Sequence, residues 1–154
     1  MKSALALLLA AALACVACGQ TATPEDEVRA VLGALEAAAE AGDTGAFGDF
    51  VSAAYQDPYG HDREKLRAFV AFHVMRSGRG REVIVRVRDV RIEPGEPARA
   101  AVTLAVGLAG GGSARGPGGL GAEVYAVDLD LLREDDAWRV SWAQWHAAPA
   151  SDLL

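Results

Sequence analysis

The spacing of apolar residues changes once along this chain, between residues 77 and 82. Before this point, three segments carry apolar side chains every three to four positions, and after it apolar and polar side chains alternate. The first spacing is typical of amphipathic helices and the second of half-buried strands. Because the helices come first and the strands follow, rather than alternating, the sequence predicts an α+β fold with a mainly antiparallel sheet.

The helix boundaries are indicated by capping residues. Thr23 is a good N-cap, Pro24 suits the first helical position and Gly42 provides a stop. A short second helix is expected to start after Asp43 or Thr44 and to end near Tyr55. Asp62 is expected to cap a third helix, whose inward stripe would be Leu66, Phe69, Val70, His73 and Val74.

Four strands are expected after the helices. Val83, Val85 and Val87 share one face, but the next apolar residues have the opposite parity, which predicts a β-bulge near Arg88–Asp89. The second strand covers Ala100–Leu108, and the Gly-rich residues 110–121 are expected to form a hairpin loop. The third strand covers Glu123–Arg133. In the fourth, Trp138 and Trp142 are expected to share a face, with a register slip before Trp145.

The N-terminus has the layout of an export signal. Lys2 is followed by an apolar run, Ala4–Ala14, which is too short to cross a bilayer. The residues Ala17-Cys18-Gly19 resemble the junction of bacterial lipoprotein signals, and Cys15, after Leu13-Ala14, is an alternative. We prefer Cys18 as the acylated residue. The division expected is a signal at 1–18, a tether at 19–22, a domain at 23–148 and a tail at 149–154.

The lipoprotein resemblance implies a place for the chain in the cell. Acyl chains would attach the exported protein to a membrane without a spanning segment. Neither Gly19 nor Val16, the residues after the two candidate cysteines, is Asp, so the resemblance implies the outer membrane, facing the periplasm.

Composition excludes several classes of partner and cofactor. The formal net charge of −6 argues against nucleic-acid binding, which depends on cationic contacts to phosphates. The exported domain keeps at most one cysteine, so it has neither an internal disulfide nor a cysteine metal site. His61, His73 and His146 lack metal-ligand spacing. No metal and no cofactor is therefore expected.

Two motifs resemble those of the NTF2-like, or SnoaL-like, superfamily. One is the aromatic-Asp-Pro turn at Tyr55–Tyr59, which follows a short helix. The other is the terminal strand with Trp138-Arg139-Val140 after an acidic turn. The resemblance implies three N-terminal helices packed on a curved, four-stranded sheet, forming a cone with a pocket at its wide end. Some members of this superfamily are isomerases, cyclases or dehydratases, and many bind ligands or partners without catalysis.

The side chains expected to line the pocket are aromatic or ionisable: Tyr55, Tyr59, His61, His73, Trp142 and Trp145. His73 lies on the inward stripe of its helix and would be either a general base or a core histidine hydrogen-bonded to backbone. Asp57 and His61 flank a turn that could bring them together as an acid–base pair; the alternative is that they serve the turn alone.

These residues favour one function and leave others open. The favoured interpretation is a membrane-anchored, periplasm-facing module that binds a small apolar ligand or a protein, without catalysis. The alternative is an isomerase, cyclase or dehydratase that removes a proton from a small carbon acid, with His73 or Asp57 as base and Tyr55 as hydrogen-bond donor. A homodimer formed through the open face of the sheet is a third possibility.

Overall fold

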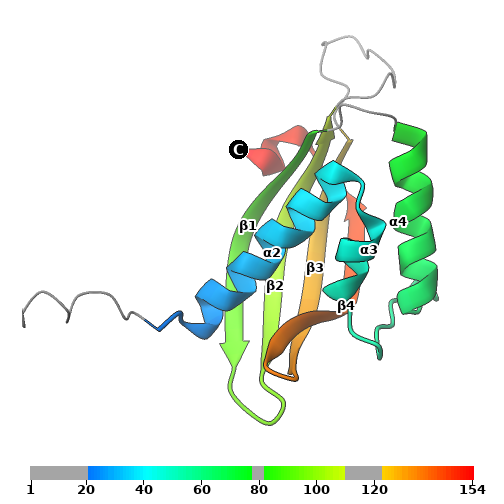
Figure 1. Ribbon diagram of the computed structural model, residues 1–154. Helices are drawn as coiled ribbons and strands as arrows, with labels where there is room; N and C mark the ends of the chain where they lie inside the picture. Colours follow the sequence, from blue (N-terminus) through cyan, green and yellow to red (C-terminus); the bar gives the residue numbers. More distant parts are fainter. Residues whose placement is uncertain (1–20, 78–81, 110–122) are drawn as a thin grey trace, which may run out of the picture.

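In a computed structural model of the chain, the structure describes residues 21–77, 82–109 and 123–154. Within these residues, three α-helices lie on one side of a four-stranded antiparallel sheet with strand order β1-β2-β3-β4 (Figure 1). The expected α+β architecture is confirmed. The leader with Cys15 and Cys18, and the Gly-rich segment 110–121, lie outside the described residues. The elements are α2 (Pro24–Ala41), α3 (Thr44–Asp49), α4 (Arg63–Ser77), β1 (Glu82–Glu93), β2 (Arg99–Ala109), β3 (Glu123–Glu134), β4 (Ala137–Ala147) and a short 3-10 turn, η2 (Ala150–Leu153).

The helix caps lie where the sequence predicted them. The Thr23 hydroxyl accepts from Asp26 N at 3.2 Å, and the Asp26 carboxylate accepts from Thr23 N at 3.0 Å, which completes a capping box. Gly42 ends α2 with φ of 69°, a left-handed conformation that suits glycine. Asp62 caps α4 by accepting from Lys65 N at 2.9 Å.

The second helix is shorter than predicted. It ends at Asp49, not near Tyr55, and residues 50–56, which we call the connecting segment, run beside β4 without regular structure, with a turn closed by a hydrogen bond from Tyr55 N to the Ser52 carbonyl at 3.2 Å. Ser52 N donates to the Val140 carbonyl at 2.9 Å, and Gln56 N donates to the Ser141 carbonyl at 3.2 Å. The free edge of β4 offers this segment backbone partners, and pairing with them replaces further helical turns.

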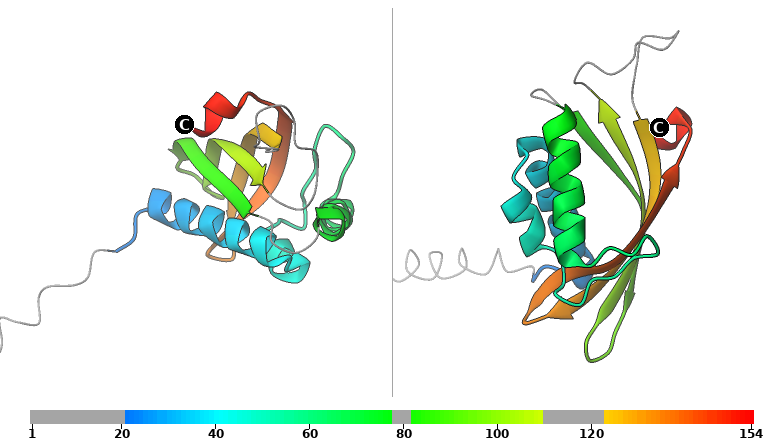
Figure 2. Two further views of the ribbon diagram at one scale, coloured as in Figure 1. Left: turned by 90° about the horizontal axis from the view of Figure 1, so that it is seen from above. Right: turned by 90° about the vertical axis from the view of Figure 1, so that its right-hand side faces the viewer.

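Two register shifts bend the sheet (Figure 2). The first lies between Val87 and Asp89, which confirms the predicted bulge. The second lies at Asp130/Leu131 on β3, opposite the stretch of β4 between Val140 and Trp142. It reverses the parity of β4, so Trp138 is buried but Trp142 pairs with Asp130 on the other face. The prediction that Trp138 and Trp142 share a face is therefore wrong.

One apolar core joins the helices, the connecting segment and the inner face of the sheet. Val28 and Leu32 enter it from α2, and Tyr55 enters from the connecting segment. Burial of this apolar surface is the main source of stability for a fold with no disulfide in its described part. From the sheet and α4, the core also receives Leu66, Ala100, Val102, Leu104, Leu131, Trp138, Val140 and Ala143.

The C-terminal turn covers part of the opposite face of the sheet, away from α2 (Figure 2). Leu153 packs over Gly107, where an added Cβ would lie 2.5 Å from its Cδ1. The Leu153 carbonyl accepts from Arg86 Nε at 3.3 Å, and Arg88 lies 3.7 Å from the Asp152 carboxylate. Residues Ala150–Leu153, within the segment expected as a tail, thus pack on the sheet.

Both edges of the sheet have side-chain or backbone partners. At β1, Val83 N donates to the Glu40 carboxylate at 3.2 Å, and Val85 N donates to the Glu36 carboxylate at 3.0 Å. At β4, the connecting segment takes the same role. Unpaired strand edges promote pairing with other chains, and these contacts occupy part of each edge. None of the helices among residues 21–77, 82–109 and 123–154 is long and apolar enough to span a membrane.

Candidate functional site

The candidate site is built around the tight turn that precedes α4. Asp57-Pro58-Tyr59-Gly60 closes with a hydrogen bond from Gly60 N to the Asp57 carbonyl at 3.2 Å. Gly60 has φ of 83°, a backbone conformation that residues with a Cβ rarely adopt. The turn predicted from the Pro-Gly pattern is confirmed, and it places His61 next to Asp57.

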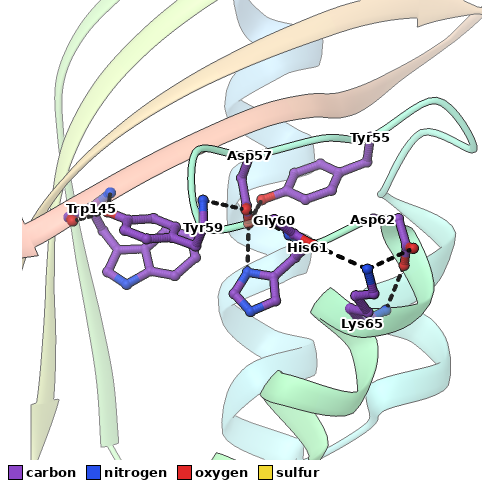
Figure 3. Close-up of polar contacts among 8 residues, drawn as sticks. All are labelled: Tyr55, Asp57, Tyr59, Gly60, His61, Asp62, Lys65 and Trp145. Atoms are coloured by element: carbon purple, nitrogen blue, oxygen red, sulfur yellow. Dashed lines mark hydrogen bonds and ion pairs between the residues drawn. The ribbon is translucent and has the colours of Figure 1, made fainter.

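Asp57 is the centre of a compact hydrogen-bond network (Figure 3). Its Oδ1 accepts from the backbone N–H groups of Tyr59 and His61, both at 2.9 Å. Its Oδ2 accepts from the Tyr55 hydroxyl at 3.0 Å and contacts His61 Nδ1 at 2.8 Å. The side chain is 0% exposed. A buried carboxylate with four donors is fully satisfied and needs no further partner.

The network fixes the charge of Asp57. Burial raises the pKa of its carboxyl, but the hydrogen bonds from the His61 backbone, the His61 ring and Tyr55 outweigh burial and hold the pKa below the usual range. Burial, followed by the hydrogen bond to Asp57 and its negative charge, raises the pKa of Tyr55 far above its usual value. At neutral pH the pair is therefore an aspartate and a neutral phenol that donates to it.

His61 is oriented by this aspartate. Its Nδ1 contacts the carboxylate, so in the neutral ring Nδ1 carries the proton and Nε2 has a free lone pair. The His61 side chain is 22% exposed, whereas the Asp57 side chain is not. An imidazole held in this way can accept a proton or a hydrogen bond through Nε2 while Asp57 stabilises the charged ring.

Three aromatic rings, those of Tyr59, Phe69 and Trp145, lie beside this imidazole, and together with His61 we call them the aromatic cluster. The ring centroids of Tyr59 and Trp145 are 4.3 Å apart, and those of His61 and Phe69 are 5.3 Å apart. His61 lies nearly parallel to Trp145, with centroids 6.3 Å apart. The Tyr59 hydroxyl donates to the Trp145 carbonyl and accepts from Trp145 N at 3.1 Å, so it holds the turn to β4.

The structure brings together only some of the predicted pocket residues. Tyr59, His61 and Trp145 lie in the aromatic cluster. Tyr55 is buried in the core, and its hydroxyl serves Asp57 instead of facing a pocket. Trp142 lies on the opposite face of the sheet, because the β4 register shift precedes it.

His73 departs from its predicted inward position. It is exposed, and its ring packs on two rings of its own helix, Phe69 at 4.4 Å and Phe72 at 5.7 Å. The helical period fixes the side of α4 on which His73 lies, but not how far along that side the neighbouring elements reach. Leu66, two turns earlier, is buried on the same side.

Sequence reasoning missed two features of the site. It left open which pair supplies the acid–base chemistry and did not foresee that four donors occupy Asp57. It also missed the contact between Tyr59 and the Trp145 backbone, which joins residues far apart in the sequence and leaves no local pattern. The part of the chain that the structure describes contains no group of three His, Cys, Asp or Glu side chains suited to a metal ion.

Three helices packed on a bent, four-stranded antiparallel sheet define a domain of the NTF2-like fold. No family model matches the sequence, and no curated protein matches it. Solved structures do match the fold. One is an NTF2-like protein of unknown function from Shewanella oneidensis, with a TM-score of 0.62 and 15% identity, covering 80% of this chain and 98% of that one.

Two further structures of this fold carry names that suggest an activity. A candidate dehydratase of the NTF2-like family from Streptomyces avermitilis has a TM-score of 0.62 and 16% identity, covering 83% of this chain and 100% of that one. A candidate scytalone dehydratase from Novosphingobium aromaticivorans has a TM-score of 0.64 and 10% identity, covering 80% of this chain and 83% of that one. At these identities the likeness establishes the fold and leaves the function open.

Proposed function

We propose that this domain is a ligand-binding module that holds a small apolar molecule against the aromatic cluster. The observation that carries the proposal is that three aromatic rings lie beside the oriented imidazole of His61. Tyr59, although held at its hydroxyl, is 47% exposed. Flat aromatic walls with one polar group are typical of sites for small apolar ligands.

The oriented imidazole sets the polarity of the ligand. His61 presents Nε2 as an acceptor because Nδ1 is committed to Asp57. A ligand that carries a single hydroxyl or amide N–H beside an apolar body matches this arrangement. If the ligand instead presented a hydrogen-bond acceptor to Nε2, both acceptors would lack a donor, which costs free energy away from water.

The test uses the neutral fluorophore N-phenyl-1-naphthylamine as an apolar probe. Trp145→Ala removes one wall of the site, and Trp142→Ala is the matched control, because Trp142 lies on the other face of the sheet. Loss of one aromatic wall is expected to weaken binding about fivefold or more, whereas the control should bind as the parent chain does. Equal binding by both variants, with unchanged circular dichroism, would refute the proposal.

We further propose that Cys18 carries an acyl anchor that holds the module at the outer membrane, facing the periplasm. Support comes from the export-signal layout and the Ala17-Cys18-Gly19 junction. Cells fed an alkyne fatty acid should label the parent chain and the Cys15→Ser variant, but not Cys18→Ser. Labelling lost only in Cys15→Ser would move the anchor to that residue. Labelled protein found only in the inner-membrane fraction would contradict the location.

A second candidate function is removal of a proton from a small carbon acid, and the contact of 2.8 Å between His61 Nδ1 and Asp57 favours it. The roles differ from those expected. Asp57 is saturated with donors and Tyr55 is committed to Asp57, so His61 Nε2 is the base and Asp57 positions it. The resemblance to structures called dehydratases is consistent with this chemistry.

The second candidate is tested with 5-nitrobenzisoxazole, a general probe of proton abstraction. His61→Ala should lower the rate at least about a hundredfold, in line with the usual contribution of a general base. His73→Ala is the control, because His73 lies outside the Asp57 network, and it should leave the rate unchanged. Equal rates for His61→Ala and the parent chain would exclude His61 as a base and would leave the binding proposal standing.

A further inference from the structure

A second concave region lies apart from the aromatic cluster and shares no residue with it. It is an open pocket of about 360 Å³ between the end of α3, the start of α4 and the β3–β4 hairpin. Five charged residues from these elements line it: Asp49, Arg63, Glu134, Asp135 and Arg139. Its lining is therefore polar and carries charges of both signs, unlike the site proposed for an apolar ligand.

Two of these five charges are committed to each other. Arg139 Nη1 donates to the Glu134 carbonyl at 3.0 Å and lies 3.8 Å from the Glu134 carboxylate. The same carboxylate accepts from the buried Ser52 hydroxyl at 2.7 Å. Arg139 and Glu134 thus form an electrically neutral wall of the pocket, which Ser52 joins to the connecting segment.

The third charge, Arg63, is held without an ionic partner. Its Nη2 donates to the Gly48 carbonyl at 2.9 Å, and its Nε is buried with no hydrogen-bond partner in the described part of the chain. Among the ion pairs between described residues, none involves Arg63. A neutral carbonyl orients this guanidinium but leaves its positive charge uncompensated.

The remaining charges, Asp49 and Asp135, are exposed carboxylates. Neither takes part in an ion pair with another described residue. Asp135 has φ of 49° in the hairpin between β3 and β4, so its place on the pocket wall is fixed by the backbone. The pocket therefore presents one uncompensated guanidinium and two uncompensated carboxylates.

This charge pattern selects the ligand. A simple anion would meet two carboxylates, and a simple cation would meet the uncompensated guanidinium. A molecule that carries one negative and one positive charge pairs with both the guanidinium and the carboxylates. The pocket volume lies near the small end of the range for ligand pockets, so the molecule should be small. We infer that this pocket binds a small amino-acid-like zwitterion, with its carboxylate on Arg63 and its ammonium between Asp49 and Asp135.

The inference is tested by titrating the ¹⁵N-labelled full-length chain with zwitterions of increasing length: glycine, β-alanine, 4-aminobutyrate and 5-aminopentanoate. Shifts of the Arg63 Nε–Hε signal and the Asp135 amide signal report binding. One length should saturate both signals, whereas butyrate and butylamine, each with a single charge, should bind about tenfold or more weakly. The preferred length measures the separation of the two charge sites.

Variants assign the two ends of the ligand. Arg63→Gln should weaken binding of the preferred zwitterion about tenfold or more, and Asp135→Asn, which tolerates the same backbone, should weaken it by a similar factor. Arg91→Gln, in an exposed pair with Asp89 on β1, is the matched control and should bind normally. Equal binding of butyrate, butylamine and the zwitterions, or unchanged binding by Arg63→Gln, would overturn the inference. Neither result would affect the aromatic cluster.

Discussion

Replacement of Asp57 by asparagine tests whether the four-donor network stabilises the domain. The change keeps the shape of the side chain but removes its charge and turns one acceptor into a donor. The amide oxygen can keep the two backbone N–H groups of Tyr59 and His61. The amide nitrogen then faces the Tyr55 hydroxyl and His61 Nδ1, which both donate to the carboxylate in the parent chain.

The expected loss follows from these contacts. In Asp57→Asn, the two backbone N–H groups donate to a neutral amide oxygen instead of a charged carboxylate. The two side-chain hydrogen bonds, with Tyr55 and His61, must reverse their donor and acceptor. A hydrogen bond to a charged group contributes about 1 kcal/mol more than a neutral one, and the Tyr55 hydroxyl, in a residue 1% exposed, risks losing its acceptor. The free energy of unfolding should fall by about 2–4 kcal/mol, and Tm by roughly 6–20 °C.

Thermal unfolding followed by circular dichroism measures this loss, and its pH dependence adds a second readout. The folded-state pKa of Asp57 lies below its unfolded value of about 3.9. Asp57 therefore contributes stability that is fully present above the unfolded pKa and is lost as pH falls through the folded pKa. The difference in stability between the parent chain and Asp57→Asn should shrink as pH falls below about 4.

The matched control is Asp89→Asn, the same substitution in an exposed pair with Arg91. Exposed ion pairs contribute little, so Tm should change by no more than a few degrees. Equal effects of Asp57→Asn and Asp89→Asn would show that the network does not stabilise the fold. A deficit of Asp57→Asn that stays constant down to pH 3 would show that the charge of Asp57 is not its source.

Three further variants test contacts elsewhere in the domain. Gly107→Ala places a Cβ 2.5 Å from Leu153 Cδ1 and should lower the free energy of unfolding, measured with urea, by about 1–3 kcal/mol. In a double-mutant cycle, Gly107→Ala should cost much less when Leu153 is already alanine, because the clashing side chain is then absent. Joint replacement of Glu36 and Glu40 by alanine uncovers the two N–H groups that they bind on β1, and light scattering should then detect oligomers that the parent chain does not form at the same concentration. Thr23→Ala removes the capping box of α2 and should lower the free energy of unfolding by about 1 kcal/mol in urea; an unchanged value would show that the cap is not needed.

Local patterns predicted the features that depend on neighbouring residues. The caps at Thr23, Gly42 and Asp62 follow from groups within four positions of each helix end. The contact between Asp57 and His61 is of the same kind, because a turn of fixed geometry joins them. These features are encoded by the backbone preferences of a few consecutive residues, and the sequence displays them directly.

The features that the sequence did not reveal depend on distant segments. Residues 50–56 leave the helical conformation because β4 supplies partners from the far end of the chain. Leu153 packs on β2 because Gly107 has no side chain that would fill this space. The burial of His73 was mispredicted for a related reason, since periodicity fixes a direction but says nothing about what lies in that direction.

The four donors to Asp57 all come from residues 55–61. Contacts so close in sequence require little loop closure, so this heptapeptide can assemble its charged centre early in folding, before the sheet is complete. The hydrogen bonds to Asp57 are therefore local, whereas its shelter is not, because Tyr55 is buried by residues of α2 and the sheet. Loosening of the core would expose Asp57 to water before its four donors are lost.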